Sequence, residues 1–121
     1  YRIDGEVMVL PTTEIISEND FVDYDAKYNG KSQEITPARL DANTVEEVHN
    51  NVKKLYRQLG LSGVCRSEFI IEGGTPHLLE VNTIPGLTAA SLIPQQVSAA
   101  GIELSDFFES LLTEAMKKPL I

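Results

Sequence analysis

The fold is decided by a stretch that reads VCRSEFIIEGGTPHLLEVN from Val64 to Asn82. Both of its ends are rich in β-branched, aromatic and aliphatic residues, a composition that favours strands. Between them lies Glu72-Gly-Gly-Thr75, a turn sequence of the kind that joins two antiparallel strands. The stretch therefore predicts a β-hairpin with strands over residues 64–71 and 77–82.

The register of this hairpin decides which side chains share a face. Side chains alternate along a strand, so Arg66 and Glu68 share one face, as do Glu80 and Asn82 on the partner strand. A three-residue loop over 73–75 sets Glu68 opposite Glu80 and Arg66 opposite Asn82, whereas a two-residue loop shifts the pairing and mixes the faces. We expect the three-residue loop because it leaves the other face mostly apolar, with Cys65, Phe69, Ile71, His77, Leu79 and Val81.

Two carboxylates that meet across a strand pair, with their Cβ atoms about 5 Å apart, destabilise the pair unless something compensates. A divalent cation would do so, since Glu68, Glu80 and the amide oxygen of Asn82 are hard oxygen ligands of the kind that Mg²⁺ prefers. The alternative is a solvated polar face on which Arg66 neutralises one glutamate. Residue spacing alone leaves both interpretations open.

The longest helical pattern covers residues 44–59. Thr44 and Glu47 match a capping box at its start, and Gly60 occupies the position of a left-handed C-cap. The apolar residues between them recur every three or four positions, which indicates one buried face. They are Val45, Val48, Val52, Leu55, Tyr56 and Leu59.

Two shorter helical patterns follow the hairpin and extended segments precede the long helix. The helices are predicted over 91–100, ended by Gly101, and over 104–115, begun by Ser105. Residues 1–16 read as extended with a turn at Asp4-Gly5, and residues 17–40 show no sustained periodicity. This order of elements predicts an α+β fold with mainly antiparallel pairing.

Composition excludes several classes of function. The chain has 121 residues, 18 acidic and 10 basic, and a net charge of −8, which argues against nucleic acid as a partner. No apolar run approaches the roughly 20 residues of a membrane-spanning helix, so we expect no membrane association. The single cysteine, Cys65, excludes an internal disulfide framework and is expected to pack rather than react.

Two further segments could contribute to a site. Pro85-Gly86 forces a tight bend, and Ser91 stands where the next helix begins, so the free N–H groups there suit a carboxylate or phosphate. A plain serine cap is the simpler interpretation of Ser91. Lys27 lies in an irregular stretch, where it is either a solvated side chain or a group that closes over a phosphate.

Three motifs in this order resemble the C-terminal half of the D-alanine–D-alanine ligase family, ATP-grasp enzymes of peptidoglycan precursor synthesis. They read DYDAKY at 23–28, GVCRSE at 63–68 and LEVNTIPGLTAASLIP at 79–94. The resemblance runs along essentially the whole chain. It implies that residues 1–121 are the C-terminal, ATP- and Mg-binding part of an ATP-grasp domain, and that the N-terminal domain and part of the central domain lie outside the chain.

The resemblance also implies a reaction. ATP phosphorylates the carboxylate of one D-alanine, and the amine of a second attacks the acyl phosphate to give D-alanyl-D-alanine for the cell wall. It implies ligands for two Mg²⁺ ions, or Mn²⁺, at Glu68, Glu80 and Asn82, and catalytic roles for Arg66, Lys27 and Tyr28. Lys27, Phe21 and Leu79 would contact ATP, and Gly86, Ser91 and Leu92 the second D-alanine.

Two positions depart from the family pattern. Glu68 stands where many relatives have Asp, which shifts the ion placement, and Val22 stands where many have an aromatic residue, which affects loop packing. Because the resemblance assigns further ATP-binding groups to chain before Tyr1, we expect the 121 residues alone to make no dipeptide. The parent enzyme is expected to be a homodimer of the bacterial cytoplasm.

Other functions stay open at this point. Within the enzyme class, the rivals are a D-alanine–D-lactate or D-alanine–D-serine ligase and another ATP-grasp carboxylate–amine ligase. The intact Lys27-Tyr28 pair favours D-alanine as the second substrate over lactate or serine. From a different class, the chain could be a non-catalytic acidic binding module whose glutamates are merely solvated.

Overall fold

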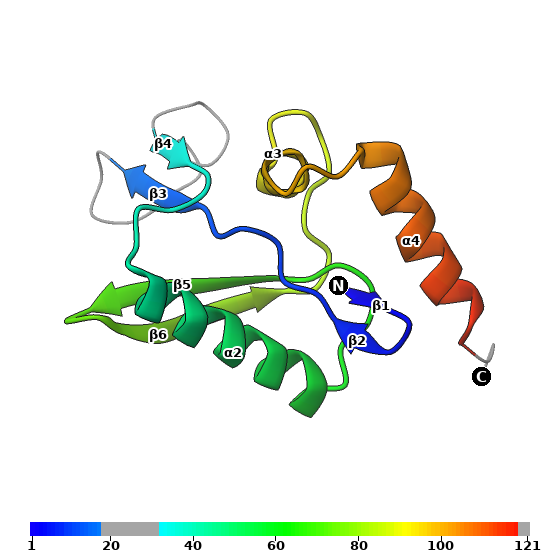
Figure 1. Ribbon diagram of the computed structural model, residues 1–121, viewed down its shortest axis with the longest axis horizontal. Coiled ribbons are helices and arrows are strands. Elements are labelled where there is room, and N and C mark those ends of the chain that lie inside the picture. The colour runs from blue at the N-terminus through cyan, green and yellow to red at the C-terminus, as the bar shows by residue number, and fades with distance from the viewer. Residues whose placement is uncertain (18–31, 119–121) are drawn as a thin grey trace.

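The computed structural model describes residues 1–17 and 32–118, which form three pairs of strands and three helices (Figure 1). In chain order the elements are β1 (Arg2–Ile3), β2 (Glu6–Val7), β3 (Glu14–Ser17), β4 (Ser32–Ile35), α2 (Ala42–Gln58), β5 (Arg66–Glu72), β6 (Thr75–Asn82), α3 (Leu92–Ala99) and α4 (Leu104–Met116). Each strand pairs with its neighbour in sequence, and all three pairs are antiparallel. The predicted α+β class is confirmed.

The first strand pair follows the prediction and the second corrects it. Asp4 and Gly5 close the β1–β2 turn with φ angles of 50° and 81°, the left-handed pair of a two-residue hairpin. In the stretch expected to be irregular, β4 pairs with β3 from Glu14–Ile35 to Ser17–Ser32. The strand was not predicted because Ser-Gln-Glu-Ile has no apolar alternation, and only its cross-strand partner defines it.

The N-cap of helix α2 lies three residues before the predicted cap, Thr44. The carboxylate of Asp41 accepts a hydrogen bond of 2.7 Å from the backbone N–H of Thr44, so Asp41 is the N-cap. Thr44 lies inside the first turn and is buried, so the predicted capping box with Glu47 is wrong. At the other end, Gly60 has φ of 61°, and its neighbour Leu61 donates to the Tyr56 carbonyl, a Schellman ending as predicted.

Helix α3 lies across the β5–β6 hairpin from α2, with α4 packed beside α3 (Figure 1). Helix α3 ends as predicted before Gly101, which has φ of 74°. Helix α4 begins at Leu104 with Glu103 as its N-cap, because the N–H of Phe107 already bonds to the Glu103 carbonyl at 3.0 Å. The predicted cap, Ser105, is therefore a residue of the first helical turn and not the cap.

The β5–β6 hairpin has a two-residue turn, not the predicted three-residue loop. Gly73 and Gly74 have φ angles of 58° and 80°, and Glu72 pairs with Thr75. This turn favours the pairing that would set Glu68 against Leu79, but a β-bulge after Phe69–Leu78 leaves Leu79 without a partner. Beyond the bulge, Glu68 lies opposite Glu80 as predicted, although for a different reason.

The bulge also changes the membership of the two faces. His77 pairs with Ile70 and so lies on the same face as Glu68, not on the mostly apolar face where it was predicted. Phe69 pairs with Leu78 on the other face. Helix α2 lies along one side of the hairpin, and α3 with the β3–β4 pair lies on the other (Figure 1). The hairpin is thus held between two groups of elements.

The main core joins the start of the chain to its last two helices. Tyr1 and Phe107 meet edge to face with ring centroids 5.0 Å apart, and Ile93 and Val97 of α3 complete the buried cluster. A smaller contact places Val48 and Tyr56 of α2 in the interior, with the Tyr56 hydroxyl donating to the Gly63 carbonyl at 2.7 Å. In the described ranges, no helix has the length and apolar character needed to cross a bilayer.

Candidate active site

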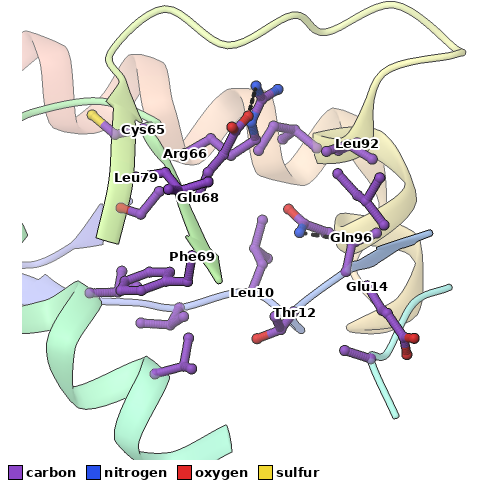
Figure 2. Close-up of a pocket in the computed structure, with 18 of the residues that line it drawn as sticks. Leu10, Thr12, Glu14, Cys65, Arg66, Glu68, Phe69, Leu79, Leu92 and Gln96 are labelled. Carbon is purple, nitrogen blue, oxygen red and sulfur yellow. Dashed lines mark hydrogen bonds and ion pairs between the residues drawn. The ribbon is translucent and has the colours of Figure 1, made fainter. Parts of the chain in front are cut away.

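The residues predicted to carry the chemistry come together where β5 meets β6. Glu68 lies opposite Glu80, and Arg66 lies opposite Asn82 two residues further along the ladder. Figure 2 shows Arg66 and Glu68 pointing the same way, while Phe69 points to the opposite side of the strand. The geometry therefore confirms the predicted juxtaposition of two carboxylates, a guanidinium and an amide on one face.

Arg66 neutralises one of the two carboxylates. Its Nη2 lies 2.8 Å from Oε1 of Glu68, and both side chains are largely shielded, with 18% and 23% of their surface exposed. Glu80 is exposed and pairs with no basic side chain of residues 1–17 or 32–118. One negative charge at this point of the hairpin is therefore uncompensated by the described residues.

The guanidinium of Arg66 has a hydrogen-bond donor that this ion pair does not use. Its Nε is buried and has no hydrogen-bond partner within the described ranges 1–17 and 32–118. A buried donor without a partner costs free energy, about 1–3 kcal/mol for a polar group. An anionic ligand oxygen would supply the missing acceptor, so this atom marks the Arg66 side as a place for a carboxylate or phosphate.

A cavity of about 780 Å³ opens beside these residues. Its walls come from the segment before β3, from β5, and from α2 and α3, so elements far apart in sequence enclose it (Figure 2). Predicted site residues in its lining are Arg66, Glu68, Leu79, Glu80 and Leu92. The cavity thus joins the acidic hairpin face to a largely apolar wall, a combination suited to a ligand with a charged and an apolar part.

Leu79 is the bulged residue and a predicted ATP contact. Its side chain lines the cavity while 59% of its surface stays exposed. A leucine exposed to this extent at the edge of a cavity is available to an apolar ring. The bulge therefore has a second consequence besides register, because it turns this side chain out of the ladder.

Of the predicted site residues at the end of β6 and in the bend after it, only Leu92 belongs to the cavity lining, and Asn82, Gly86 and Ser91 do not. Asn82 Oδ1 accepts a hydrogen bond of 3.0 Å from the N–H of Ile84, which closes the first turn of the bend. Gly86 approaches Ser91 so closely that a Cβ on Gly86 would lie 2.8 Å from the Ser91 hydroxyl oxygen. Ser91 is the N-cap of α3 as expected, yet its side chain makes no capping hydrogen bond.

Three predicted site residues, Phe21, Lys27 and Tyr28, and the departure noted at Val22, fall in residues 18–31, outside the described part of the chain. Their assignments therefore rest on the sequence. The described residues on either side of this segment, Ser17 and Ser32, pair with each other at the end of the β3–β4 ladder.

Sequence reasoning did not identify several residues that line the cavity. Leu10 and Thr12 come from the extended segment before β3, and Gln96 comes from α3. Gln96 donates to the Thr13 hydroxyl at 3.1 Å, which ties α3 to this segment. These contacts join residues 83 positions apart and leave no local pattern.

Glu68, Glu80 and Asn82 have the chemistry of magnesium ligands, but a complete coordination shell would also need oxygens from substrate phosphates or water. Within residues 1–17 and 32–118, no three His, Cys, Asp or Glu side chains lie close enough to bind a metal together. Glu68, Glu80 and Asn82 supply two carboxylates and an amide oxygen, all hard ligands. Mg²⁺ commonly takes one or two carboxylates and completes its shell with substrate phosphates and water, so this set fits that kind of site.

Burial shifts the pKa values of two other titratable side chains near the cavity, Cys65 and His49. Burial raises the pKa of the Cys65 thiol, which disfavours the thiolate and supports a packing role over a nucleophilic one. Burial, followed by the charge of Lys53, lowers the pKa of His49, whose Nε2 lies 3.2 Å from the Thr12 hydroxyl. His49 is thus a half-buried residue at the edge of the α2 packing.

Comparison with known proteins identifies the family. The family model described as "D-ala D-ala ligase C-terminus" matches residues 3–113. The D-alanine–D-alanine ligase of Flavobacterium johnsoniae is 56% identical over 108 residues, which are 89% of this chain and 33% of that protein. The corresponding ligase of Leptospira interrogans is 45% identical over an alignment of 123 positions, which covers 99% of this chain and 35% of that protein. The chain thus spans about a third of the length of these curated relatives.

Solved structures agree with the sequence match. The crystal structure of a D-alanine–D-alanine ligase from Bacillus anthracis complexed with ATP superposes with a TM-score of 0.74 at 33% identity, covering 89% of this chain and 36% of that one. D-alanyl-alanine synthetase A from Vibrio cholerae has the same fold, with a TM-score of 0.73 at 24% identity, over 97% of this chain and 37% of that one. The ATP-grasp fold inferred from the motifs is confirmed. This chain belongs to the D-alanine–D-alanine ligase family, to the region that the family model describes as its C-terminus.

Proposed function

We propose that this chain is the C-terminal, catalytic part of an ATP-dependent ligase that joins two D-alanine molecules into D-alanyl-D-alanine. The observation that carries the proposal is the register of β5 and β6, with Glu68 opposite Glu80 and Arg66 opposite Asn82, beside the cavity. Family membership supports it, and so does the ATP complex of the B. anthracis relative. The proposed setting is the bacterial cytoplasm, where ATP and D-alanine supply peptidoglycan precursors.

The proposed reaction has two steps. In the first, a carboxylate oxygen of one D-alanine attacks the γ-phosphorus of ATP, a new O–P bond forms, and ADP leaves. In the second, the amine of another D-alanine attacks the acyl carbon, phosphate leaves, and the amine nitrogen loses a proton. Both steps develop negative charge on oxygen, so the protein contributes mainly by positioning and by electrostatic stabilisation.

Arg66 is suited to stabilise that charge. Its guanidinium is held by Glu68 at 2.8 Å, and its buried Nε still lacks an acceptor among the described residues. A guanidinium fixed in this way is preorganised to bind an oxyanion without moving. In the proposed mechanism, Arg66 contacts the acyl phosphate and then the oxyanion of the tetrahedral intermediate.

Glu68, Glu80 and Asn82 are the proposed metal ligands. When bound there, Mg²⁺ or Mn²⁺ would neutralise the phosphate charge and orient the transferring group. The exposed carboxylate of Glu80, for which the described residues provide no cation, is the group that gains most from such an ion. Asn82 is oriented by its hydrogen bond to the N–H of Ile84, which leaves a second lone pair on Oδ1.

The proposed substrate contacts divide between the cavity and the bend after β6. Leu79 would pack against the adenine together with Phe21, and Lys27 with Tyr28 would contact the phosphates. Gly86, Ser91 and Leu92 would hold the second D-alanine, because they surround the start of α3. A homodimeric parent enzyme belongs to the same proposal.

The test uses the full-length enzyme that carries this chain. Glu80→Gln and Asn82→Ala are each expected to lower ATP- and D-alanine-dependent phosphate release by at least about 100-fold, since each removes a ligand of the phosphate-bound ion. Glu109→Gln on the exposed face of α4 is the matched control and should retain the wild-type rate. Unchanged turnover in both site variants would overturn the site assignment.

The same assay separates the neighbouring functions. Analysis of the products formed from D-alanine alone, D-alanine with D-lactate, and D-alanine with D-serine distinguishes a dipeptide ligase from a depsipeptide or mixed-peptide ligase. We expect D-alanyl-D-alanine as the main product. Absence of any nucleotide-dependent product, with Mg²⁺ and an ATP analogue also failing to bind, would favour the non-catalytic acidic module instead.

A further inference from the structure

The hydroxyl of Ser91 is engaged with Thr88 rather than with the helix that it caps. Ser91 has the extended backbone of an N-cap, φ −82° and ψ 160°, yet its side chain makes no bond to α3. Instead, its Oγ accepts a hydrogen bond of 3.2 Å from the N–H of Thr88 and lies 2.8 Å from the Thr88 hydroxyl. The N–H of Ser91 also donates to the Thr88 carbonyl at 2.9 Å, so residues 88–91 form a closed turn.

These contacts bear on the direction in which Ser91 can donate a proton. A serine hydroxyl has one proton to donate and two lone pairs that accept. The Thr88 N–H occupies one lone pair. If the Thr88 hydroxyl donates to the other, both acceptor positions of Ser91 are filled and its own proton must point elsewhere. Ser91 then acts toward a ligand as a donor only, which suits a carboxylate.

Gly86 confines the same hydroxyl from another side. A Cβ at Gly86 would lie 2.8 Å from Ser91 Oγ, a separation that real Cβ atoms essentially never show. Glycine at position 86 therefore leaves the space that the Ser91 hydroxyl occupies, and any larger residue there would displace this hydroxyl.

We propose that Thr88 is a positioning residue for the second substrate: its hydroxyl donates to Ser91 Oγ and thereby directs the Ser91 proton to the carboxylate of the second D-alanine. This inference rests on the proposed function, in which Ser91 contacts that carboxylate. Thr88 itself does not touch the substrate. Its contribution is to remove the alternative in which Ser91 accepts a proton and presents a lone pair to an anion.

The experiment is a steady-state comparison in the full-length enzyme of Thr88→Val, Thr88→Ser and Ser91→Ala. Valine keeps the shape and the backbone N–H of threonine but removes the hydroxyl, and the exposed site accommodates it. We expect Thr88→Val to raise the KM for the second D-alanine about tenfold, the effect of weakening one hydrogen bond to a charged group. The KM for ATP, the kcat at saturating D-alanine and the melting temperature should stay near wild type.

Rescue and control variants complete the test. Thr88→Ser retains the hydroxyl and should restore the wild-type KM, and Thr113→Val, at an exposed threonine of α4, should change none of these values. If Thr88→Val lowers kcat and melting temperature together and Thr88→Ser does not restore them, Thr88 is only structural and the inference is wrong.

The experiment distinguishes failure of the Thr88 positioning role from failure of the proposed function. A raised KM in Ser91→Ala with an unchanged KM in Thr88→Val would overturn the positioning role alone and leave the proposed function intact. An unchanged KM for the second D-alanine in Ser91→Ala would remove Ser91 from the substrate site. That result would overturn both the substrate assignment and the role of Thr88 that depends on it.

Discussion

Glu68 and Glu80 lie directly opposite each other across the β5–β6 hairpin because Leu79 bulges out of the ladder between the turn and this pair. Two acidic side chains opposed in this way repel each other. Arg66 offsets the charge of Glu68 at 2.8 Å, and no basic side chain of residues 1–17 or 32–118 pairs with Glu80. The bulge therefore both creates the acidic pair and turns Leu79 toward the cavity beside it.

The acidic pair predicts a stability that depends on divalent cations. In the full-length enzyme, Mg²⁺ with an ATP analogue at 100 times its dissociation constant should stabilise the folded protein by about 2.7 kcal/mol. Glu80→Gln should largely abolish this increase while leaving the metal-free protein as stable as wild type or slightly more so, since it removes the repulsion. Thermal unfolding with and without the ligands measures both effects. An equal ligand-induced shift in wild type and variant would contradict the metal site.

Arg66→Lys should impair catalysis although the charge is retained. An ammonium cannot reproduce the planar set of donors by which Arg66 holds Glu68 and still presents Nε. We expect kcat to fall by about 100-fold, as for the loss of one oxyanion donor. Arg57→Lys, in the last turn of α2 and away from the cavity, is the matched control and should retain wild-type kcat. Equal kcat values in the two variants would show that guanidinium geometry is unimportant.

Gly86→Ala should weaken binding of the second D-alanine by displacing the Ser91 hydroxyl. The new Cβ would lie 2.8 Å from Ser91 Oγ but 3.6 Å from Ser91 Cβ, which is an ordinary contact. The clash should therefore disappear in the Gly86→Ala, Ser91→Ala double variant. We expect the double variant to have the KM of Ser91→Ala alone, a non-additive result typical of groups in contact. Additive effects on KM would contradict a route through Ser91.

The pKa of His49 predicts a loss of stability at mildly acidic pH. Burial, then the charge of Lys53, lowers this pKa below its ordinary value of 6.5, so the unfolded chain binds the proton more tightly than the folded chain. The free energy of unfolding should therefore fall as pH decreases from about 6.5 toward the folded pKa, and it should be insensitive to this group at higher pH. Urea unfolding of wild type and His49→Gln over this range measures the difference.

The control for His49 is the second histidine. His77→Gln, at an exposed position of β6, should leave the acid-sensitive part of the stability profile unchanged. His49→Gln should flatten it, because glutamine does not titrate. Parallel profiles for wild type and His49→Gln would assign the pH dependence to another group.

The 121-residue chain by itself is expected to make no dipeptide. It spans about a third of the length of its curated relatives, and we propose that groups in the rest of the enzyme hold ATP and the first D-alanine. Phosphate release should stay at background when the purified chain is given ATP, Mg²⁺ and D-alanine. Release that requires both ATP and D-alanine would contradict this prediction, and the full-length enzyme under the same conditions provides the positive control.

Local patterns predicted the elements well where the responsible interactions are close in sequence. Gly60 and Gly101 end their helices with left-handed backbone, and Asp4-Gly5 turns the first hairpin. The predicted N-caps of α2 and α4 were wrong. Asp41 and not Thr44 caps α2, and Glu103 and not Ser105 caps α4. A helix begins where its first backbone hydrogen bonds form, and several polar residues near that point could each have been the cap.

The pairing of the site was predicted correctly from an incorrect turn. Gly73-Gly74 favours a two-residue turn, as two adjacent glycines with positive φ allow, and this alone would have set Glu68 against Leu79. The bulge that sets Glu68 opposite Glu80 forms next to the Phe69–Leu78 pair, and no local sequence pattern predicts it. A bulge depends on the twist of the strands and on what packs against them. Both are properties of the folded chain and not of a short stretch of sequence.

The sequence by itself determined the α+β class, the hairpin with its carboxylates, the helix ends at glycine and the family, because these depend on local backbone preferences and on motifs of contiguous residues. Only the tertiary structure decided that Leu79 bulges, that Gln96 reaches Thr13, and that the Ser91 hydroxyl turns away from its helix to Thr88. Each of these results from competition between several possible partners. Which partner a residue contacts depends on distances and burial in the folded chain, and the spacing of residues along the sequence does not give these quantities.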